Sequence, residues 1–408
     1  MRKLSFAGLL LFAASIPLED SLRYGVGRIS KLLGAFLFAA WFLALARNGL
    51  KRRPTIVHIW ASAFVAWAAL SYFWTLAPGP TVAKITTLVQ MLAIVFVVYD
   101  LVADHSELVV VMRAFLLGSF GSAVVTFLNA QSGNAAEGTV RFASANAGPN
   151  NTGCILAIAV MIACYAYRVE DRRWRWCYRL LVPTLAMGAL FTASRTALLA
   201  MALGGMVLVF TKGNFTPARL TGMALAALLG LFLVSTYVPT GSITRLLTTD
   251  DEISAGTLNN RTTYWERSFE VWGDHPVNGV GAGAFASQNE ILGGVAAVAH
   301  NAFISITVEL GAVGIGLWLA MLGAAVLGLG AAPPRVRRAW TAIGLAWAVG
   351  ASGLTWEVRK ITWFLLALAV VLGRILSEER QEALQDESSP VTQEHDESEA
   401  PVPVPAGQ

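Results

Sequence analysis

Long apolar segments follow one another along almost the whole chain. A helix that crosses the hydrocarbon core of a bilayer needs about 20 mostly apolar residues. The 408-residue chain is 55% hydrophobic and only 14% charged, which suits repeated crossing. The sequence therefore predicts an all-α polytopic membrane protein with about 12 transmembrane helices. The predicted spans are residues 4–18, 32–46, 55–74, 85–101, 107–128, 151–167, 179–193, 196–211, 219–237, 301–329, 339–356 and 361–377.

Lysine and arginine are distributed unevenly between the two sets of segments that connect these spans. Cytoplasmic loops of membrane proteins carry an excess of Lys and Arg. The richer set includes two dense clusters, at 47–53 and 168–179. We therefore predict that this set and both termini are cytoplasmic. The first apolar segment resembles a signal peptide, but we expect an anchor helix because many further spans follow.

The predicted spans divide the chain into four parts. Spans one to nine occupy 1–238, a large periplasmic segment occupies 239–300, and spans ten to twelve occupy 301–377. The remainder, 378–408, is acidic and rich in Ser, Pro and Gln, which predicts a disordered cytoplasmic tail. Aromatic residues at helical spacing predict one or two short helices within 239–300. They are Tyr264, Trp265, Phe269 and Trp272.

Several cations fall on the predicted outer face, where the positive-inside rule makes them less expected. Arg195 lies at a helix–helix turn, Arg141 and Arg261 lie in outer segments, and Lys84 begins span four. A cation at a helix end can simply extend its head group to water. Alternatively, these cations line an anion-binding cavity, because a guanidinium binds phosphate oxygens through two parallel hydrogen bonds.

His300 and Glu309 both belong to the stretch "VAHNAFISITVELG", where the outer segment meets span ten. An imidazole there titrates near neutral pH and suits a general base. Nine helical residues rise about 13.5 Å and turn about half a revolution. Glu309 is therefore expected to lie deep, away from His300, and to pair with an arginine or a polar backbone group. His275 is expected to be solvated.

A cationic outer cavity with one basic histidine suits few reactions. A transfer reaction on that face needs a substrate already activated in the membrane, such as a lipid-linked diphosphate sugar. The arginines would stabilise the leaving diphosphate, and His300 would take the proton of an acceptor hydroxyl. Direct attack on the anomeric carbon would invert its configuration. No metal or other cofactor is expected, although five outer-loop acids are candidate ligands: Glu19, Asp20, Asp250, Asp251 and Glu252.

Three motifs carry a resemblance to a known family. The segments "NNRTTYW…HPVNGVGAGAF…AHNAFISITVELGAVG", "TASRTALLA" and "RFASANAGPNNTG" together resemble the signature of the O-antigen ligase and polymerase superfamily. The match extends from about Tyr72 to Arg359 and excludes the tail. Each motif is short and degenerate, but their order and their placement on one face make the match fairly specific.

The resemblance implies a fold, a site and a reaction. The fold would be a bundle of the third glycosyltransferase structural class (GT-C) with a periplasmic helical subdomain. The reaction would be metal-independent transfer of O-antigen polysaccharide from undecaprenyl diphosphate to lipid A-core, at the periplasmic face of a Gram-negative inner membrane. His300, Arg195 and Arg261 would be catalytic, with Arg141 and Lys84 as weaker diphosphate ligands. Supporting roles would fall to Asn301, Tyr264, Arg267, Arg359 and Glu309, and Arg267 competes with Arg261 for the motif position.

Two alternatives stay open. One large outer segment between spans nine and ten is typical of the ligase, whereas polymerases more often have two. An O-antigen polymerase, or a ligase with another glycan acceptor, is therefore the nearest alternative. A membrane transporter is the alternative from a different class, and it rests on the deep Glu309. Against a transporter, we find no internal repeat and no matching pair of broken spans.

Overall fold

The computed structural model describes residues 2–19, 29–49, 52–136, 141–144, 148–209, 261–291 and 298–388, and all the regular secondary structure in them is helical. The α-helices are α1 (Arg2–Ser15), α2 (Ile29–Asn48), α3 (Ile56–Leu70), α4 (Pro78–Leu101), α5 (His105–Gln131), α6 (Pro149–Val169), α7 (Arg172–Phe191), α8 (Arg195–Val209), α12 (Arg261–Asp274), α13 (Phe285–Ile291), α14 (Ala302–Gly328), α15 (Pro334–Gly353) and α16 (Lys360–Ser388). Three short 3₁₀ helices are η1 (Ile16–Leu18), η2 (Ser71–Phe73) and η3 (Trp356–Val358). The prediction of an all-α membrane protein is confirmed.

Within the described residues, 7 helices are long and apolar enough to cross a membrane: α2, α3, α4, α5, α6, α14 and α16. A shorter apolar helix, α8, occupies the predicted eighth span. Helices also occupy the positions of predicted spans one, seven and eleven, as α1, α7 and α15. The predicted span 219–237 lies outside the described residues. The prediction of about 12 spans is therefore not confirmed.

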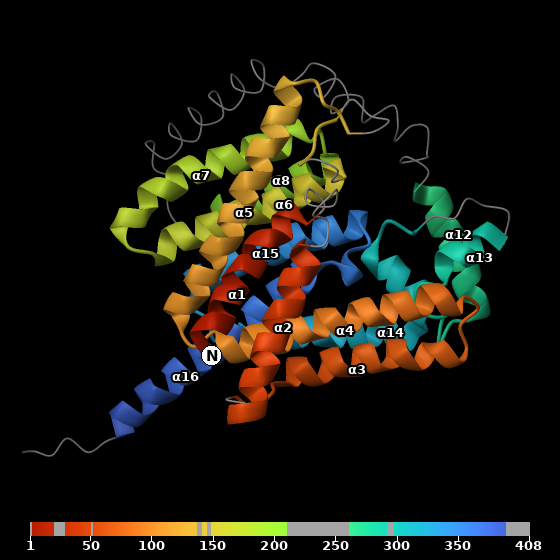
Figure 1. Cartoon of the computed structure of the whole chain (residues 1–408), viewed down its shortest axis with the longest axis horizontal. Coiled ribbons are helices and arrows are strands. Elements are labelled where there is room, and N and C mark those ends of the chain that lie inside the picture. The colour runs from red at the N-terminus through yellow and green to blue at the C-terminus, as the bar shows by residue number, and fades with distance from the viewer. Residues whose placement is uncertain are drawn as a thin grey trace, which may run out of the picture.

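The helices pack around α6 and α16. In each of these two helices 78% of the most apolar stretch is buried, against 22% in α2. α15 packs on α6 and α8, and α14 packs on α3 and α16. Figure 1 shows α3, α4 and α14 running together toward α12 and α13, while the last part of α16 projects at the other end of the molecule.

The two ends of this bundle are distinguished by the helices that begin or end there. The site end is where α8 and α14 begin and α15 ends, and α12 packs there on α14. The opposite end is where α4 ends and α5 begins. The short helices expected in 239–300 are α12 and α13, whereas 239–260 and 292–297 lie outside the described residues.

The helix α14 contains a break that shapes the site end. Gly311 has φ 68 and ψ −167, which is not a helical conformation, so the carbonyl groups before it lose their helical partners. Backbone N–H groups of the glycine-rich loop, residues 275–284, take two of them: Val280 donates to Val308 and Gly281 donates to Glu309. The indole of Trp67 donates to the carbonyl of Leu310 at 2.9 Å. The loop thus crosses α14 where the helix is open.

One predicted boundary is wrong. The tail was expected to be disordered from residue 378, but α16 continues from Lys360 to Ser388. Arg374 and Glu378 lie four residues apart on this helix and form an ion pair at 2.9 Å. Such pairs stabilise an exposed helix, and the sequence from Ser377 to Glu387 contains strong helix formers without Gly or Pro. Residues 389–408 lie outside the described residues.

Candidate active site

His300 lies in a strained turn immediately before α14. Its backbone has φ 48, and only one other described non-glycine residue, Ala193, also has a positive φ. The side chain of the next residue, Asn301, accepts hydrogen bonds from the N–H groups of Phe303 and Ile304 and so caps α14. Strained backbone of this kind persists only where its surroundings hold it, and it clusters at functional sites.

The helix α12 holds the segment that carries His300. The indole N–H of Trp265 donates to the carbonyl of Ala299 at 2.9 Å. The rings of Tyr264 and His300 have centroids 6.4 Å apart. Tyr264, which we predicted as a supporting residue, therefore lies beside the predicted base.

The environment of His300 favours the neutral imidazole. Burial lowers its pKa below the ordinary value, and the positive charge of Arg261 lowers it further. His300 is half-buried, whereas His275 in the neighbouring loop is exposed. A neutral imidazole can accept a proton, so this environment suits a general base at neutral pH.

Arg261 connects His300 to the starts of α6 and α8. Its charge acts on His300 on one side and on the thiol of Cys154, in α6, on the other. A Cβ added to Gly353, at the end of α15, would lie 3.4 Å from Nη1 of Arg261 and 3.0 Å from Cγ2 of Thr196. Arg261 therefore reaches the first turn of α8, where Arg195 precedes Thr196. Burial lowers the pKa of Arg261, and the Cys154 thiol partly opposes this shift.

The turn before α8 holds Arg195 at the helix start. Ala193 has φ 46, and the hydroxyl of Ser194 accepts a hydrogen bond from the N–H of Ala197 at 3.3 Å. The free N–H groups in the first turn of a helix favour an anion. The prediction that Arg195 lies at a helix–helix turn is confirmed. Its role in binding stays a prediction.

Arg141 is buried, with 8% of its surface exposed. It donates from Nη2 to Oδ1 of Asn150 at 2.6 Å and from Nε to the carbonyl of Thr192 at 3.1 Å. Oδ1 of Asn150 also accepts from the hydroxyl of Ser194 at 3.0 Å. Neutral oxygen atoms thus tie Arg141 to the turn before α8. Its charge also acts on Cys154, as does that of Arg261.

Lys84 has a different environment from the one we predicted. Its ammonium group bonds to Oε2 of Glu309 at 2.6 Å and to Oε1 of Glu357 at 2.8 Å. The ammonium group that was expected to bind diphosphate is therefore already paired with two carboxylates. Glu309 also accepts from the N–H of Gly283 at 2.8 Å. The predicted polar backbone partner of Glu309 is thus present, while the cation is a lysine rather than an arginine.

The remaining predicted residues lie close by in the chain. Arg267 is half-buried on α12, but the charge that acts on His300 and Cys154 belongs to Arg261. Arg359 lies between η3 and α16, and its carbonyl accepts from the N–H of Thr362 at 3.1 Å. Among the described residues, no group of three or more His, Cys, Asp or Glu side chains could hold a metal ion. Of the five candidate metal ligands, Glu19 instead pairs with Lys360, and the other four lie outside the described residues.

Sequence reasoning did not select four residues that build this site. Ser194 and Asn150 hold the turn before α8, and Trp265 holds the segment before His300. Cys154 is the fourth: the charges of Arg261 and Arg141 act on its thiol, which also bonds to Ser194. The signal for Asn150 and Ser194 was present, because polar residues flank the starts of apolar segments where helix caps are expected.

Comparison with protein families finds one relevant match, and comparison with curated proteins finds no match. Residues 180–319 match the family described as O-Antigen ligase. The matched region begins within α7 and ends within α14, and it contains Arg195, Arg261 and His300. Residues 180–319 therefore form an O-antigen ligase domain, which supports the predicted resemblance to the O-antigen ligase superfamily.

Proposed function

We propose that this chain is an inverting, metal-independent glycosyltransferase that transfers O-antigen polysaccharide from undecaprenyl diphosphate to lipid A-core. The observation that carries the proposal is the position of Arg261, whose charge acts both on His300 and on Cys154 beside the α8 turn. In this proposal a base and several cations act together at one end of a membrane bundle. The family match over 180–319 supports the same class of reaction.

The cations suit a diphosphate leaving group. Burial of Arg261 is unfavourable for its charged form, and an anionic ligand would offset that cost. Arg141 is held by the neutral oxygen atoms of Asn150 and Thr192, and Arg195 begins α8, where the helix dipole also favours an anion. Guanidinium groups bind phosphate oxygens in pairs. Three arginines would therefore stabilise the charge that develops as the sugar–phosphate bond breaks.

His300 would act as the base in a single displacement. Its neutral imidazole takes the proton from a hydroxyl group of the acceptor as that oxygen attacks the anomeric carbon. The new C–O bond forms while the bond from that carbon to the phosphate oxygen breaks, so undecaprenyl diphosphate leaves with the bonding electrons. The configuration at the anomeric carbon inverts. The imidazolium then loses its proton to water.

The membrane location fits these substrates. Both the donor and the acceptor are membrane lipids, and 7 described helices are long and apolar enough to cross the bilayer. In this proposal the chain lies in the Gram-negative inner membrane with both termini in the cytoplasm. The site end then faces the periplasm. The positive-inside rule supports this orientation, because the two densest Lys and Arg clusters fall on the other side.

The proposal is tested with His300→Ala in a strain that lacks its own ligase. We expect polysaccharide on lipid A-core to disappear while lipid-linked polymer accumulates. His275→Ala is the matched control, because His275 is exposed in a neighbouring loop and should be dispensable. If polymer fails to form at all, the chain is a polymerase. Normal ligation by His300→Ala would exclude a mechanism in which His300 is the base.

A second experiment addresses the absence of a metal requirement. The purified full-length protein is assayed with lipid-linked donor and lipid A-core in the presence of a strong chelator. Transfer should continue at an unchanged rate, since the proposed site stabilises the diphosphate with guanidinium groups alone. Strong inhibition that is reversed by a divalent metal ion would contradict the metal-independent reaction.

A further inference from the structure

A buried ionic network joins four segments of the chain near the site. Lys84 comes from α4, Ser305 and Glu309 come from α14, and Glu357 comes from η3. The ammonium group of Lys84 bonds to both carboxylates, and the hydroxyl of Ser305 donates to Oε1 of Glu357 at 2.9 Å. The fourth segment is the glycine-rich loop, which donates from Gly283 to Glu309. The exposed fractions of the Lys84, Glu309 and Glu357 side chains are only 12%, 7% and 1%.

This network is poorly suited to a purely stabilising role. It contains one cation and two acids, and burying charges costs free energy that the pairing offsets only in part. Oε2 of Glu357 is buried without a hydrogen-bond partner among the described residues. Replacing such groups by apolar side chains often stabilises a protein. The network therefore needs an explanation beyond stability.

Glu309 holds the glycine-rich loop at two points. Its side chain accepts from the N–H of Gly283 at 2.8 Å, and its backbone carbonyl accepts from the N–H of Gly281 at 2.9 Å. The carbonyl is available because α14 breaks at Gly311. A Cβ on Gly279 would lie 2.4 Å from the carbonyl carbon of Glu309, so the loop backbone lies directly against this residue. Loss of the Glu309 side chain should therefore loosen the loop.

The same network leads to both halves of the active site. Glu309 and Ser305 lie on the first part of α14, which begins two residues after His300. Glu357 lies four residues after Gly353, the residue that faces Arg261. Lys84 and Ser305 therefore join the segment that follows His300 to the segment that follows Gly353. The distance between the base and the cation depends on that connection.

We propose that Lys84, Glu309 and Glu357 are positioning residues, which hold the His300 segment and the glycine-rich loop in register with the Arg261 side of the site. They act without touching the substrate. This inference rests on the proposed transferase function. A misplacement of about 1 Å can cost about 100-fold in rate, so the network should affect turnover more than substrate binding.

The test compares Glu309→Ala with Glu170→Ala in the purified full-length protein. Glu170 is the matched control, because it is a similarly buried acid that pairs with Arg113 at the opposite end, with 4% of its side chain exposed. Glu309→Gln is the milder variant, because its amide oxygen can still accept from Gly283. Two properties are measured: deuterium uptake of peptides covering 275–285 and 308–313, and kcat and KM for transfer.

Glu309→Ala should speed exchange in both peptides and lower kcat by about 10- to 100-fold with KM changed by less than about 3-fold. Glu309→Gln should produce a smaller change in the same direction, and Glu170→Ala should leave both peptides and kcat unchanged. Unchanged exchange in Glu309→Ala would overturn the inference whatever the activity. Faster exchange with unchanged kcat would overturn the catalytic part of it. If the unmodified protein transfers no glycan, the proposed function fails, whereas faster exchange would still support the anchoring of the loop.

Discussion

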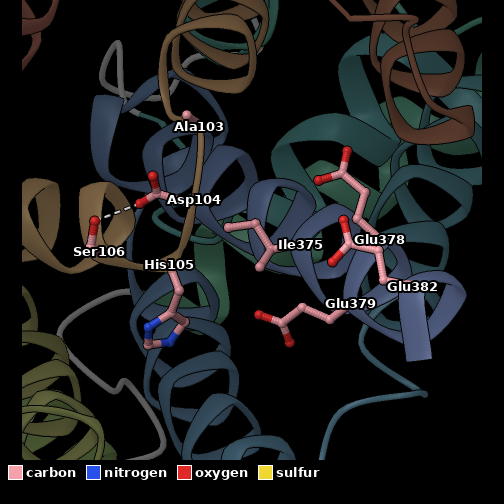
Figure 2. Close-up of a pocket in the computed structure, with 8 residues that line it drawn as sticks. All are labelled: Ala103, Asp104, His105, Ser106, Ile375, Glu378, Glu379 and Glu382. Carbon is pink, nitrogen blue, oxygen red and sulfur yellow. Dashed lines mark hydrogen bonds between the residues drawn. The ribbon is translucent and has the colours of Figure 1, made fainter. Parts of the chain in front are cut away.

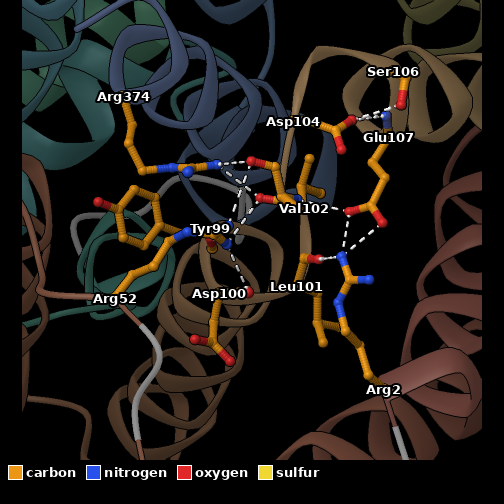
Figure 3. Close-up of polar contacts among 11 residues, drawn as sticks. Arg2, Arg52, Tyr99, Asp100, Leu101, Val102, Asp104, Ser106, Glu107 and Arg374 are labelled. Atoms are coloured by element: carbon orange, nitrogen blue, oxygen red, sulfur yellow. Dashed lines mark hydrogen bonds and ion pairs between the residues drawn. The ribbon is translucent and has the colours of Figure 1, made fainter. Parts of the chain in front are cut away.

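The two ends of the bundle use arginine in different ways. At the opposite end, Arg52 donates to the carbonyl groups of Tyr99, Asp100 and Val102, and Arg374 donates to those of Val102 and Ala103. Figure 3 shows these contacts around the end of α4. The last carbonyl groups of a helix lack helical partners, and cations there also interact well with the helix dipole. These arginines therefore complete a helix end.

Arg261, at the site end, has a different environment. Arg261 begins α12, and its charge acts on His300 and Cys154 rather than on the carbonyl groups at a helix end. The described non-glycine residues with a positive φ, Ala193 and His300, both lie at this end. The contrast indicates that arginine density alone does not identify a functional site. Arg261 differs from the arginines of the opposite end because its charge acts on His300, whose backbone is strained.

The opposite end also differs from the site end in carrying a cavity lined by acidic side chains. A cavity of about 320 Å³ at the opposite end lies between the start of α5 and the last part of α16. Figure 2 shows carboxylate groups and one imidazole around it. The lining residues include Asp104, His105, Glu378, Glu379 and Glu382. Such a surface repels a diphosphate, whereas the arginines of the site end carry the opposite charge.

The largest effect should come from Arg261→Ala. Removing one group that stabilises developing negative charge typically lowers kcat by about 100- to 1,000-fold. We expect a loss of that size in transfer by the purified protein, with little change in melting temperature. Arg52→Ala at the opposite end is the comparison, and its kcat should stay within about 2-fold of the unmodified value. Equal losses in both variants would mean that arginines at the two ends serve the same purpose.

A smaller but still large effect on stability is expected for Gly311→Ala. Gly311 has φ 68, and an added Cβ would lie 2.2 Å from the carbonyl oxygen of Val277. Strain and overpacking of this kind cost about 1–3 kcal/mol each. Gly316→Ala is the matched control, because nothing lies within 4 Å of its Cβ on the same helix. It should be neutral or stabilising by up to about 1 kcal/mol. Thermal unfolding in detergent distinguishes the two variants, and equal melting temperatures would contradict the crossing of the loop at Gly311.

Arg374→Ala should lower stability without lowering turnover. Its Nη2 donates to the carbonyl groups of Val102 and Ala103 at 2.8 and 3.0 Å. Hydrogen bonds from charged groups contribute about 1.5–3 kcal/mol each, so losing these two should cost about 3 kcal/mol or more. The melting temperature should fall, while the kcat of the folded fraction stays the same. A fall in kcat at unchanged melting temperature would assign this end a part in the reaction.

Much of the fold could be predicted because it follows from local patterns. The apolar segments of about 20 residues predicted most of the long helices, and the spacing of Tyr264, Trp265, Phe269 and Trp272 predicted α12. Asn301 before an apolar run is a helix cap, and the structure shows that cap. These features depend on residues that are close together in the chain, so they can be predicted from a single sequence.

The missed features depend on partners far away in the sequence. Lys84 was predicted to bind diphosphate, but it pairs with Glu309 and Glu357, which lie 225 and 273 residues away. The break at Gly311 was also missed, because a glycine in an apolar helix is common and only the loop crossing it reveals the opening. The depth of Glu309 could be predicted from helical rise, whereas its lysine partner, Lys84, could not.

The smallest predicted effect concerns pH and separates the charge of Arg261 from its shape. The nearby cation disfavours the imidazolium form, so its removal should raise the pKa of His300 toward its ordinary value of 6.5. Because the base must be neutral, the acidic limb of kcat/KM in Arg261→Met should move to higher pH. Arg261→Lys keeps the charge and should keep the limb in place. Arg267→Met, on the same helix, is the control and should not move it. If the acidic limb shifts equally in all three variants, the charge of Arg261 does not affect the pKa of His300. Arg261 and His300 would then be electrostatically independent.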